Sequence, residues 1–400
     1  MQETTTEVGE VVQFRLDIRR LLRTRVREAV EIVLEEELSA ALGAPRYERS
    51  DDRRGYRNGV EERSITTTTG TRNIQVPRGR VATKDGSMRE FRSEILPRYA
   101  RRTEEVDSAI LGCYLAGANS RRIRRALEPL LGEEHLSKSA VSRVVVRLKK
   151  LFEVWHHRDL SKELYGVLFL DGFHLKIRMA KRVVSAPVLA VLGVNEDGEK
   201  VLVGLRLAPS EAAANWSEVL VDLQRRGLAA PLLMVVDGHM GLNKALSAWP
   251  QVKVQRCTTH KLRNLQDHCP AHARREMKRD YDRIVHAKDG LAARGAYAEF
   301  TRKWSGLCPE VARSIEEAGA ELLTFYEFPK AMWKSLRTTN ALENLNREFR
   351  RRTKTQGSFG TEEAALTLLY GLVAFGQIKM RKIDGHRELG MLMTASTQAA

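Results

Sequence analysis

Two short apolar segments of the sequence, residues 167–170 and 232–236, are each followed by an aspartate and a glycine. A continuous apolar run of this length is typical of a β-strand that is buried on both faces. In open α/β sheets, ligands bind beyond the carboxyl ends of such strands. The pattern therefore predicts that the two strands finish at Asp171 and Asp237 and that both carboxylates face one crevice.

A third carboxylate, Glu343, lies in a segment with helical periodicity. It stands beside Asn346 and Arg347, one position around from an apolar stripe. A side chain in that place can reach from a core-packed helix toward the edge of a sheet. The stripe consists of residues at the spacing of one helix face: Leu342, Leu345 and Phe349.

Two strand aspartates and one helix glutamate form a donor set for hard divalent cations. Mg²⁺ and Mn²⁺ favour oxygen ligands, and Mg²⁺ keeps coordination positions for water and phosphate. A pair of such ions stabilises both the attacking and the leaving oxygen of an in-line displacement at phosphorus. The three carboxylates therefore predict a site for two Mg²⁺ or Mn²⁺ ions that cuts and joins phosphodiester bonds.

Each of these residues also has a plainer interpretation. Asp171 and Asp237 can each begin a tight Asp-Gly turn, a frequent role of that dipeptide. Glu343 can cap its own helix with Asn340 or pair with Arg347 four residues on. Taken one at a time, the residues leave these alternatives open.

The charge of the chain indicates a polyanionic partner. The 400 residues include 67 lysines and arginines against 51 acids, a formal charge of +16. The excess is concentrated in residues 46–102, which carry 15 basic and 8 acidic side chains, mostly arginine among the basic ones. This distribution favours nucleic acid as the partner. A basic surface that serves only solubility is the alternative.

The elements before the first apolar run are predicted to be helical, then β, then helical again. A helix is expected over 11–42, and a small β-containing basic module over 53–102. The pair of helices 121–131 and 138–152, the second capped by Ser137, has the length of a helix-turn-helix. An ordinary α-hairpin fits the same pattern.

An α/β stretch follows. Strands are predicted at 167–170, 186–194, 201–207, 232–236 and 252–255. Helices are predicted at 211–226 and 241–248, from after His260 to about Lys330, and over 339–380.

Cysteine usage and hydropathy indicate a protein of a reducing compartment. The four cysteines are too few and too scattered for a disulfide framework. No apolar stretch approaches the roughly 20 residues that a membrane-spanning helix needs. We therefore expect a cytoplasmic protein without a membrane partner.

The sequence resembles the Mutator-like DDE transposases of bacterial insertion sequences. The resemblance extends over most of the chain and rests on short motifs. These are 55–59 (GYRNG), 76–80 (VPRGR), 95–99 (ILPRY), 136–143 (LSKSAVSR), 170–178 (LDGFHLKIR), 236–242 (VDGHMGL), 255–264 with its C-x-x-H, and 337–347 (RTTNALENLNR).

The resemblance implies a fold, a triad and a partner. The core is expected to be ribonuclease H-like, with Asp171, Asp237 and Glu343 as the catalytic and metal-binding triad. A homodimer is expected on terminal inverted repeats and target DNA, associated with the bacterial nucleoid. The implied order is an N-terminal helix and basic DNA-binding region (1–105), a helix-turn-helix-like DNA-binding region (106–158), the first part of the core (159–260), a helical insertion (261–330), the second part of the core with the glutamate (331–385) and a tail (386–400).

The family's C-x-x-H signature falls on Cys257 and His260, which we expect to support the active site by packing beside it. Zinc is the alternative, since His268, Cys269 and His272 follow closely. The spacing of that second cluster does not match a zinc finger, and Pro270 interrupts it.

Contacts with DNA phosphates are expected from basic side chains in the N-terminal motifs, in the second helix of the predicted pair, and along the helix of Glu343. A solvated charged face is the alternative for the last group. The candidate DNA-binding residues are Arg57, Arg78, Arg80, Ser142, Arg143, Arg347, Arg350, Arg351 and Arg352.

The sequence thus predicts a DDE transposase that cleaves DNA at transposon ends and transfers the freed 3′-OH to another strand. Two other functions remain compatible with it. One is a metal-dependent nuclease that cuts without joining, and the other is a catalytically inactive, transposase-derived DNA-binding regulator.

Overall fold

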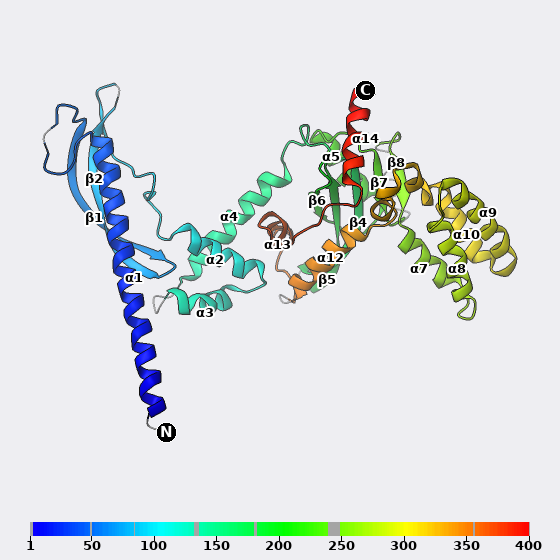
Figure 1. Cartoon of the computed structure of the whole chain (residues 1–400), viewed down its shortest axis with the longest axis horizontal. Coiled ribbons are helices and arrows are strands. Elements are labelled where there is room, and N and C mark those ends of the chain that lie inside the picture. Colours follow the sequence, from blue (N-terminus) through cyan, green and yellow to red (C-terminus); the bar gives the residue numbers. More distant parts are fainter. Residues whose placement is uncertain are drawn as a thin grey trace. The chain divides into compact units, whose positions relative to one another are not determined.

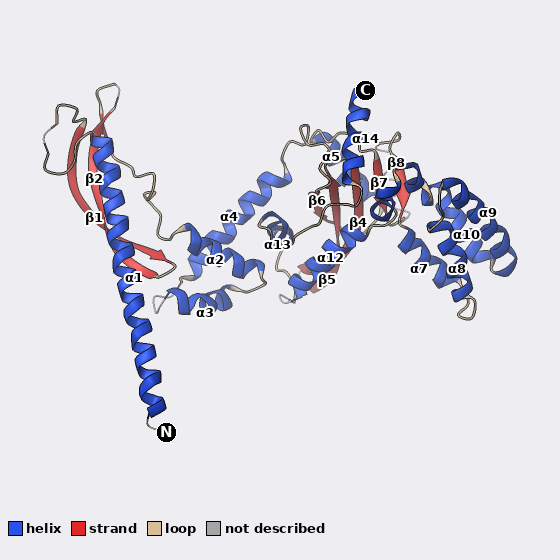
Figure 2. Cartoon of the chain, in the orientation of Figure 1, coloured by secondary structure: helices blue, strands red, loops and turns tan. Residues whose placement is uncertain are grey.

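The computed structural model describes residues 3–48, 50–83, 85–131, 136–179, 182–238, 249–354 and 357–399. The chain divides into two compact units, residues 1–146 and 147–400. Each unit contains helices and a β-sheet (Figures 1 and 2). The mixed α/β class predicted from the sequence is therefore confirmed.

The first unit begins with a long helix, α1 (Glu3–Leu42), which packs on an antiparallel sheet of order β1-β2-β3. The helix starts earlier than the predicted residue 11, because the threonines and glycine of its first turns gave no helical signal. The sheet confirms the predicted β-containing basic module. Its strands are β1 (Gly55–Thr67), β2 (Gly70–Ala82) and β3 (Met88–Glu90). Leu34 of α1 shares a buried cluster with Ile65, Ile74 and Val76 of the hairpin.

Three further helices complete this part of the chain: α2 (Glu104–Leu115), α3 (Ser120–Leu131) and α4 (Lys138–His156). Their apolar faces form a separate buried cluster that extends from Val106 to Val144. Ser137 caps α4 as predicted, since its Oγ accepts the amide hydrogen of Ala140 at 3.1 Å. The two predicted helices of the pair are thus present, and both the helix-turn-helix and the α-hairpin interpretation fit them.

The second unit is built on a five-stranded sheet of order β6-β5-β4-β7-β8. β5 is antiparallel to both β4 and β6, whereas β7 is parallel to β4 and β8 is parallel to β7. The helix α5 (Ala213–Arg225) packs Trp216 and Leu220 into the apolar core beside the sheet. The strands are β4 (Val167–Met179), β5 (Arg182–Val194), β6 (Lys200–Leu207), β7 (Leu233–Val236) and β8 (Lys253–Arg256).

The structure corrects one prediction about the first of these strands. β4 does not end at Asp171 but continues to Met179, paired with β5 along its whole length. Only its pairing with β7 stops there, at Leu170 opposite Val236. From Phe173 to Arg178 buried apolar side chains alternate with exposed polar ones, so the continuous apolar run ends at Leu170 although the strand continues. The Asp-Gly turn is therefore excluded for Asp171.

Between β8 and the helix of Glu343 lies an all-helical segment, residues 258–336, here called the helical block. Its core contains Tyr281, Phe300, Trp304 and Ile315. Its elements are α7 (Thr258–His268), α8 (Arg274–Val285), α9 (Gly290–Leu307), α10 (Pro309–Ala318), the 3₁₀ turns η2 (Gly319–Leu322), η3 (Thr324–Glu327) and η4 (Lys330–Met332), and α11 (Trp333–Leu336).

The chain finishes with α12 (Asn340–Thr353), α13 (Glu362–Ala374) and α14 (His386–Ala399). The short helix predicted over 241–248 lies outside the described residues. None of the helices in the described ranges combines the length and the apolar character that a membrane span requires.

Candidate active site

The parallel pairing of β4 and β7 brings the two strand aspartates to one level of the sheet. The last paired residues are Leu170 and Val236, and Asp171 and Asp237 are the next residue of each strand. The Asp171 side chain is buried, at 8% exposure, whereas Asp237 is half-buried. The structure therefore brings these two predicted residues together at the carboxyl end of β7.

Helix α12 brings the third carboxylate to the same place. Its stripe of Leu342, Leu345 and Phe349 is buried as predicted, and Phe349 stacks on Phe173 of β4 with ring centroids 5.6 Å apart. Glu343 lies in the first turn of this helix, with its side chain half-buried. The sheet and α12 thus place all three predicted carboxylates around one region.

The electrostatics of Asp171 confirm that these acids are close enough to interact. Its pKa is raised from the ordinary 3.8 to about 7, first by burial and then by the negative charge of Asp237. Glu343 raises it further, and the neighbouring His260 opposes the shift. Buried carboxylates that repel one another are typical of sites that hold a cation or a proton.

Asn346, which the sequence indicated only as a neighbour of Glu343, contacts the candidate site directly. It lies one turn after Glu343, is buried, and donates from Nδ2 to Asp171 Oδ2 at 2.9 Å. Within the described part of the chain, its buried Oδ1 has no hydrogen-bond partner. The signal that could have found it is a polar side chain one turn on from Leu342 and Glu343, on the buried face of the helix.

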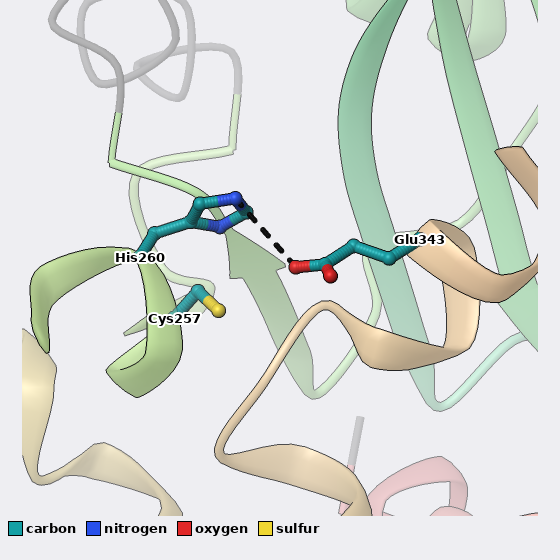
Figure 3. A group of neighbouring side chains, drawn as sticks. All are labelled: Cys257, His260 and Glu343. Carbon is teal, nitrogen blue, oxygen red and sulfur yellow. Dashed lines mark ion pairs between the residues drawn. The ribbon is translucent and has the colours of Figure 1, made fainter. Parts of the chain in front are cut away.

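Cys257 and His260 lie beside Glu343, at the start of α7 (Figure 3). His260 Nε2 is 3.6 Å from Glu343 Oε1. Thr339, the residue before α12, donates from its amide and its hydroxyl to Cys257 Sγ at 3.4 and 3.3 Å. Its hydroxyl is also 3.3 Å from Glu343 Oε1. A small polar network therefore links α7 to the end of α12 that carries Glu343.

This network favours a charged imidazole beside Glu343. The hydrogen bond with Cys257 is the largest contribution that raises the pKa of His260, from 6.5 to about 9. For Cys257, burial raises the pKa, but the hydrogen bond and charge of His260 outweigh it and the net shift is downward. A positive His260 attracts the Glu343 carboxylate toward the start of α7.

The same three side chains also satisfy the distance requirement of a metal site. One ligand atom each of Cys257, His260 and Glu343 lies within 4.8 Å of the others. Zinc accepts this set of sulfur, nitrogen and oxygen ligands. The supporting role and the zinc alternative predicted for Cys257 and His260 both fit this geometry.

The candidate DNA-binding residues occupy two kinds of position. Arg57 points inward, with its Nη1 2.6 Å from Glu35 and its Nη2 donating to Ser39 at 2.9 Å. Arg352 donates from Nη2 to the carbonyl of Gln377 at 2.6 Å and also pairs with Glu348. The exposed ones are Arg78, Arg80, Ser142, Arg143, Arg347, Arg350 and Arg351.

Some of the exposed arginines are also paired. Arg78 is 3.4 Å from Glu90, Arg351 is 2.8 Å from Glu348, and Arg347 donates to Asn344 rather than pairing with Glu343. Arg350 lies over the ring of Phe173, two residues beyond Asp171 in β4. Arg350 on α12 is thus an exposed arginine close to the strand of the candidate site.

The chain thus combines an α/β unit that holds a cluster of carboxylates with a basic N-terminal module, a combination that suits a protein that acts on nucleic acid. The family model described as "Transposase, Mutator family" matches residues 2–377. The chain therefore belongs to the Mutator family of transposases.

Curated relatives agree with the family match. The chain is similar to a transposase for an insertion sequence element of Burkholderia multivorans, with 35% identity over 360 residues and 88% of each chain covered. It is 33% identical over 367 residues to one from Lactococcus lactis subsp. lactis, with 91% of each chain covered. One from Mycobacterium tuberculosis is 33% identical over 381 residues, which are 95% of this chain and 90% of the relative.

Proposed function

We propose that this chain is a DDE transposase that cleaves DNA at the terminal inverted repeats of its element and joins the freed 3′-OH to target DNA. Asp171, Asp237 and Glu343 hold two Mg²⁺ or Mn²⁺ ions in this proposal. The observation that carries it is the convergence of three carboxylates from distant elements: Asp171 and Asp237 follow the last paired residues of β4 and β7, and Glu343 lies on α12, whose Asn346 bonds Asp171 at 2.9 Å. Burial and then the charge of Asp237 raise the pKa of Asp171 to about 7. Hard cations relieve such repulsion and accept these oxygens.

We interpret the five-stranded sheet as the ribonuclease H-like core that the resemblance implies. Its three antiparallel strands are followed by two that run parallel to β4, and the aspartates flank the β4–β7 contact. The helical block stands in the chain between β8 and the helix of Glu343, where the implied insertion belongs. Both interpretations are supported by the order of the elements.

The chain's own residues orient the carboxylates. Asn346 fixes one oxygen of Asp171 through its amide, and His260 draws Glu343 toward α7. When bound, the divalent cations supply charge stabilisation for the attacking and leaving oxygens and lower the pKa of water. Because the protein provides no covalent nucleophile in this scheme, positioning and electrostatics carry the rate.

Recognition of DNA is assigned to exposed basic side chains. In the first unit, Arg80 of β2 and Arg143 of α4 are exposed and have room for phosphate oxygens. In the second unit, Arg350 lies beside the strand of Asp171. Two transposon ends have to be held together during joining, so we propose that the active form is a homodimer.

The test of the proposed function compares wild type with Asp237→Asn on DNA that carries the inverted repeat. Wild type is expected to nick the end with Mg²⁺ and to join a pre-cut 3′-OH end to a second strand. Asp237→Asn is expected to bind the same DNA and to do neither. Nicking without joining by wild type would identify a nuclease, and binding without nicking would identify a DNA-binding regulator.

A further inference from the structure

Residues 255–261, where β8 ends and α7 begins, contact the rest of the helical block as well as Glu343. Gln255, which is fully buried, donates to the carbonyl of Leu322 at 3.1 Å and accepts the amide hydrogen of Phe325 at 2.7 Å. Arg256 and Lys261 are also buried, at 1% and 3% exposure. Two cationic side chains are thus buried where the chain leaves β8, the strand next to β7.

Arg256 contacts the peptide that follows the second aspartate. Its Nη2 donates to the carbonyl oxygen of Gly238 at 3.0 Å. Gly238 has a φ of +92°, and a Cβ added there would lie 2.1 Å from Arg256 Nε. On the preceding side, the amide of Cys257 donates to the carbonyl of Val236 at 2.7 Å. The backbone is therefore held on both sides of Asp237.

The guanidinium of Arg256 is itself held by the helical block. Its Nη2 also donates to both carboxylate oxygens of Glu317, on α10, at 3.0 and 3.1 Å. Lys261 Nζ reaches the same carboxylate at 2.7 Å and the carbonyl of Ser314 at 2.8 Å. One half-exposed carboxylate thus serves two buried cations, with Glu321 farther away, at 3.9 Å from Arg256 Nη1.

This arrangement makes the position of Arg256 depend on Glu317. A buried guanidinium without a partner carries a large desolvation penalty and moves to find one. Because the same Nη2 serves Glu317 and Gly238, a shift of the guanidinium changes the hydrogen bond to the peptide after Asp237. A residue outside the carboxylate cluster can therefore alter the direction of a carboxylate inside it.

We infer that Glu317 of α10 is a positioning residue for the proposed reaction, which acts through Arg256 on the Gly238 carbonyl and so fixes Asp237. The inference rests on the proposed function of Asp237 as a cation ligand. It gives the helical block a part in the chemistry in addition to its contribution to folding. Groups that orient metal ligands typically contribute about 10- to 100-fold to metal affinity or activity.

The experiment measures Mn²⁺ binding by calorimetry on the full chain, together with nicking of inverted-repeat DNA, for Glu317→Gln and Arg256→Lys. Glutamine keeps the size of Glu317 without its charge, and the lysine side chain is one bond shorter than that of arginine, so its Nζ does not reach the position of Nη2. Glu316→Gln is the matched control, because Glu316 is exposed and lies beside Glu317 on α10. Asp237→Asn is the reference for loss of the site.

Both variants are expected to bind Mn²⁺ about 10- to 100-fold more weakly per folded molecule. Nicking should recover at raised Mn²⁺, DNA affinity should stay at the wild-type value, and Glu316→Gln should match wild type. The variant that carries both changes should bind Mn²⁺ no more weakly than the single variant with the lower Mn²⁺ affinity, since both changes act on one contact. If Glu317→Gln does not fold, Glu317→Asp, which keeps the charge on a shorter side chain, is expected to show a smaller loss of Mn²⁺ affinity.

Two results overturn the inference and leave the proposed function intact. One is wild-type Mn²⁺ affinity in folded Glu317→Gln or Glu317→Asp while Asp237→Asn binds none. The other is a lowered melting temperature with unchanged Mn²⁺ affinity per folded molecule, which would give Glu317 a structural role only. Wild-type Mn²⁺ binding by Asp237→Asn would instead contradict the proposed function itself.

Discussion

The carboxylate site and the basic N-terminal module use charge in opposite ways. At the site, acids on β4, β7 and α12 are partly or fully buried and close enough that Asp171 is difficult to ionise. In the module, the described arginines are mostly exposed, and Arg57, which is largely enclosed, is neutralised by Glu35. Uncompensated burial therefore marks the candidate site for chemistry, while exposure marks the surface for a polyanion.

The largest difference between the two regions is expected in nicking. Glu343→Gln keeps the size of the side chain but removes a cation ligand. It should lower nicking at least about 10³-fold, because charge stabilisation at the reacting oxygens is lost. Its affinity for inverted-repeat DNA, measured by gel shift, should remain within about twofold of wild type. Residual nicking above a hundredth of the wild-type rate would remove Glu343 from the triad.

The second expectation concerns stability without cations. The pKa of Asp171 in the folded chain, about 7, exceeds its ordinary 3.8, so the folded state binds the proton more tightly. The free energy of unfolding should therefore fall as the pH rises from about 4 to about 7, by up to about 4 kcal/mol. Asp171→Asn should abolish this dependence and be more stable than wild type at pH 8.

Urea unfolding in EDTA at pH 5 and pH 8 measures this difference. Adding Mg²⁺ should stabilise wild type at pH 8 and leave Asp171→Asn unchanged, because only the former retains its ligand. Parallel pH profiles for the two proteins would contradict the charge repulsion on which the comparison of the two regions depends.

The third prediction tests the hydrogen bond to Asp171. Asn346→Ala removes the Nδ2 donor that holds Asp171 Oδ2 and should lower nicking about 10- to 100-fold, with a higher Mg²⁺ concentration needed for the half-maximal rate. Asn344→Ala, on the exposed side of the same helix, is the control and should nick normally. Equal rates for the two variants would show that Asn346 does not orient the aspartate.

The smallest effect is expected in the basic module. Arg80→Ala should weaken DNA binding by a few fold and lower the salt dependence of log K by roughly one unit of slope. Arg57→Ala should leave that slope unchanged and instead lower the unfolding free energy by about 1–3 kcal/mol, because Glu35 loses its partner. Titrations from low to moderate salt separate the two outcomes, and a reversed pattern would assign the phosphate contact to Arg57.

The placement of the three acids near one another could be predicted from the sequence because apolar strands and a helical stripe leave a clear pattern around each acid. The continuation of β4 beyond Asp171 could not, since its outer half is no longer paired with β7 and alternates apolar with polar residues in place of a continuous apolar run. Asn346 and Thr339 were missed because their roles depend on contacts between elements far apart in the chain.

The same reason limited the prediction of DNA contacts. Arg57 and Arg80 belong to equally basic motifs, and only the packing of α1 on the hairpin shows that Arg57 is enclosed. Arg256 gave no signal at all, because its partner Glu317 follows it at a distance set by the helical block. Residue type and spacing thus predict which acids are candidate cation ligands, but they predict less well which side chains orient those acids.

In the proposed function, three acids from β4, β7 and α12 hold the divalent cations that cut DNA. Anomalous scattering from Mn²⁺, in crystals of the full chain with inverted-repeat DNA, locates these cations. We expect Mn²⁺ density bounded by carboxylate oxygens of Asp171, Asp237 and Glu343. Density confined to Cys257 and His260, with the two aspartates unliganded, would contradict it.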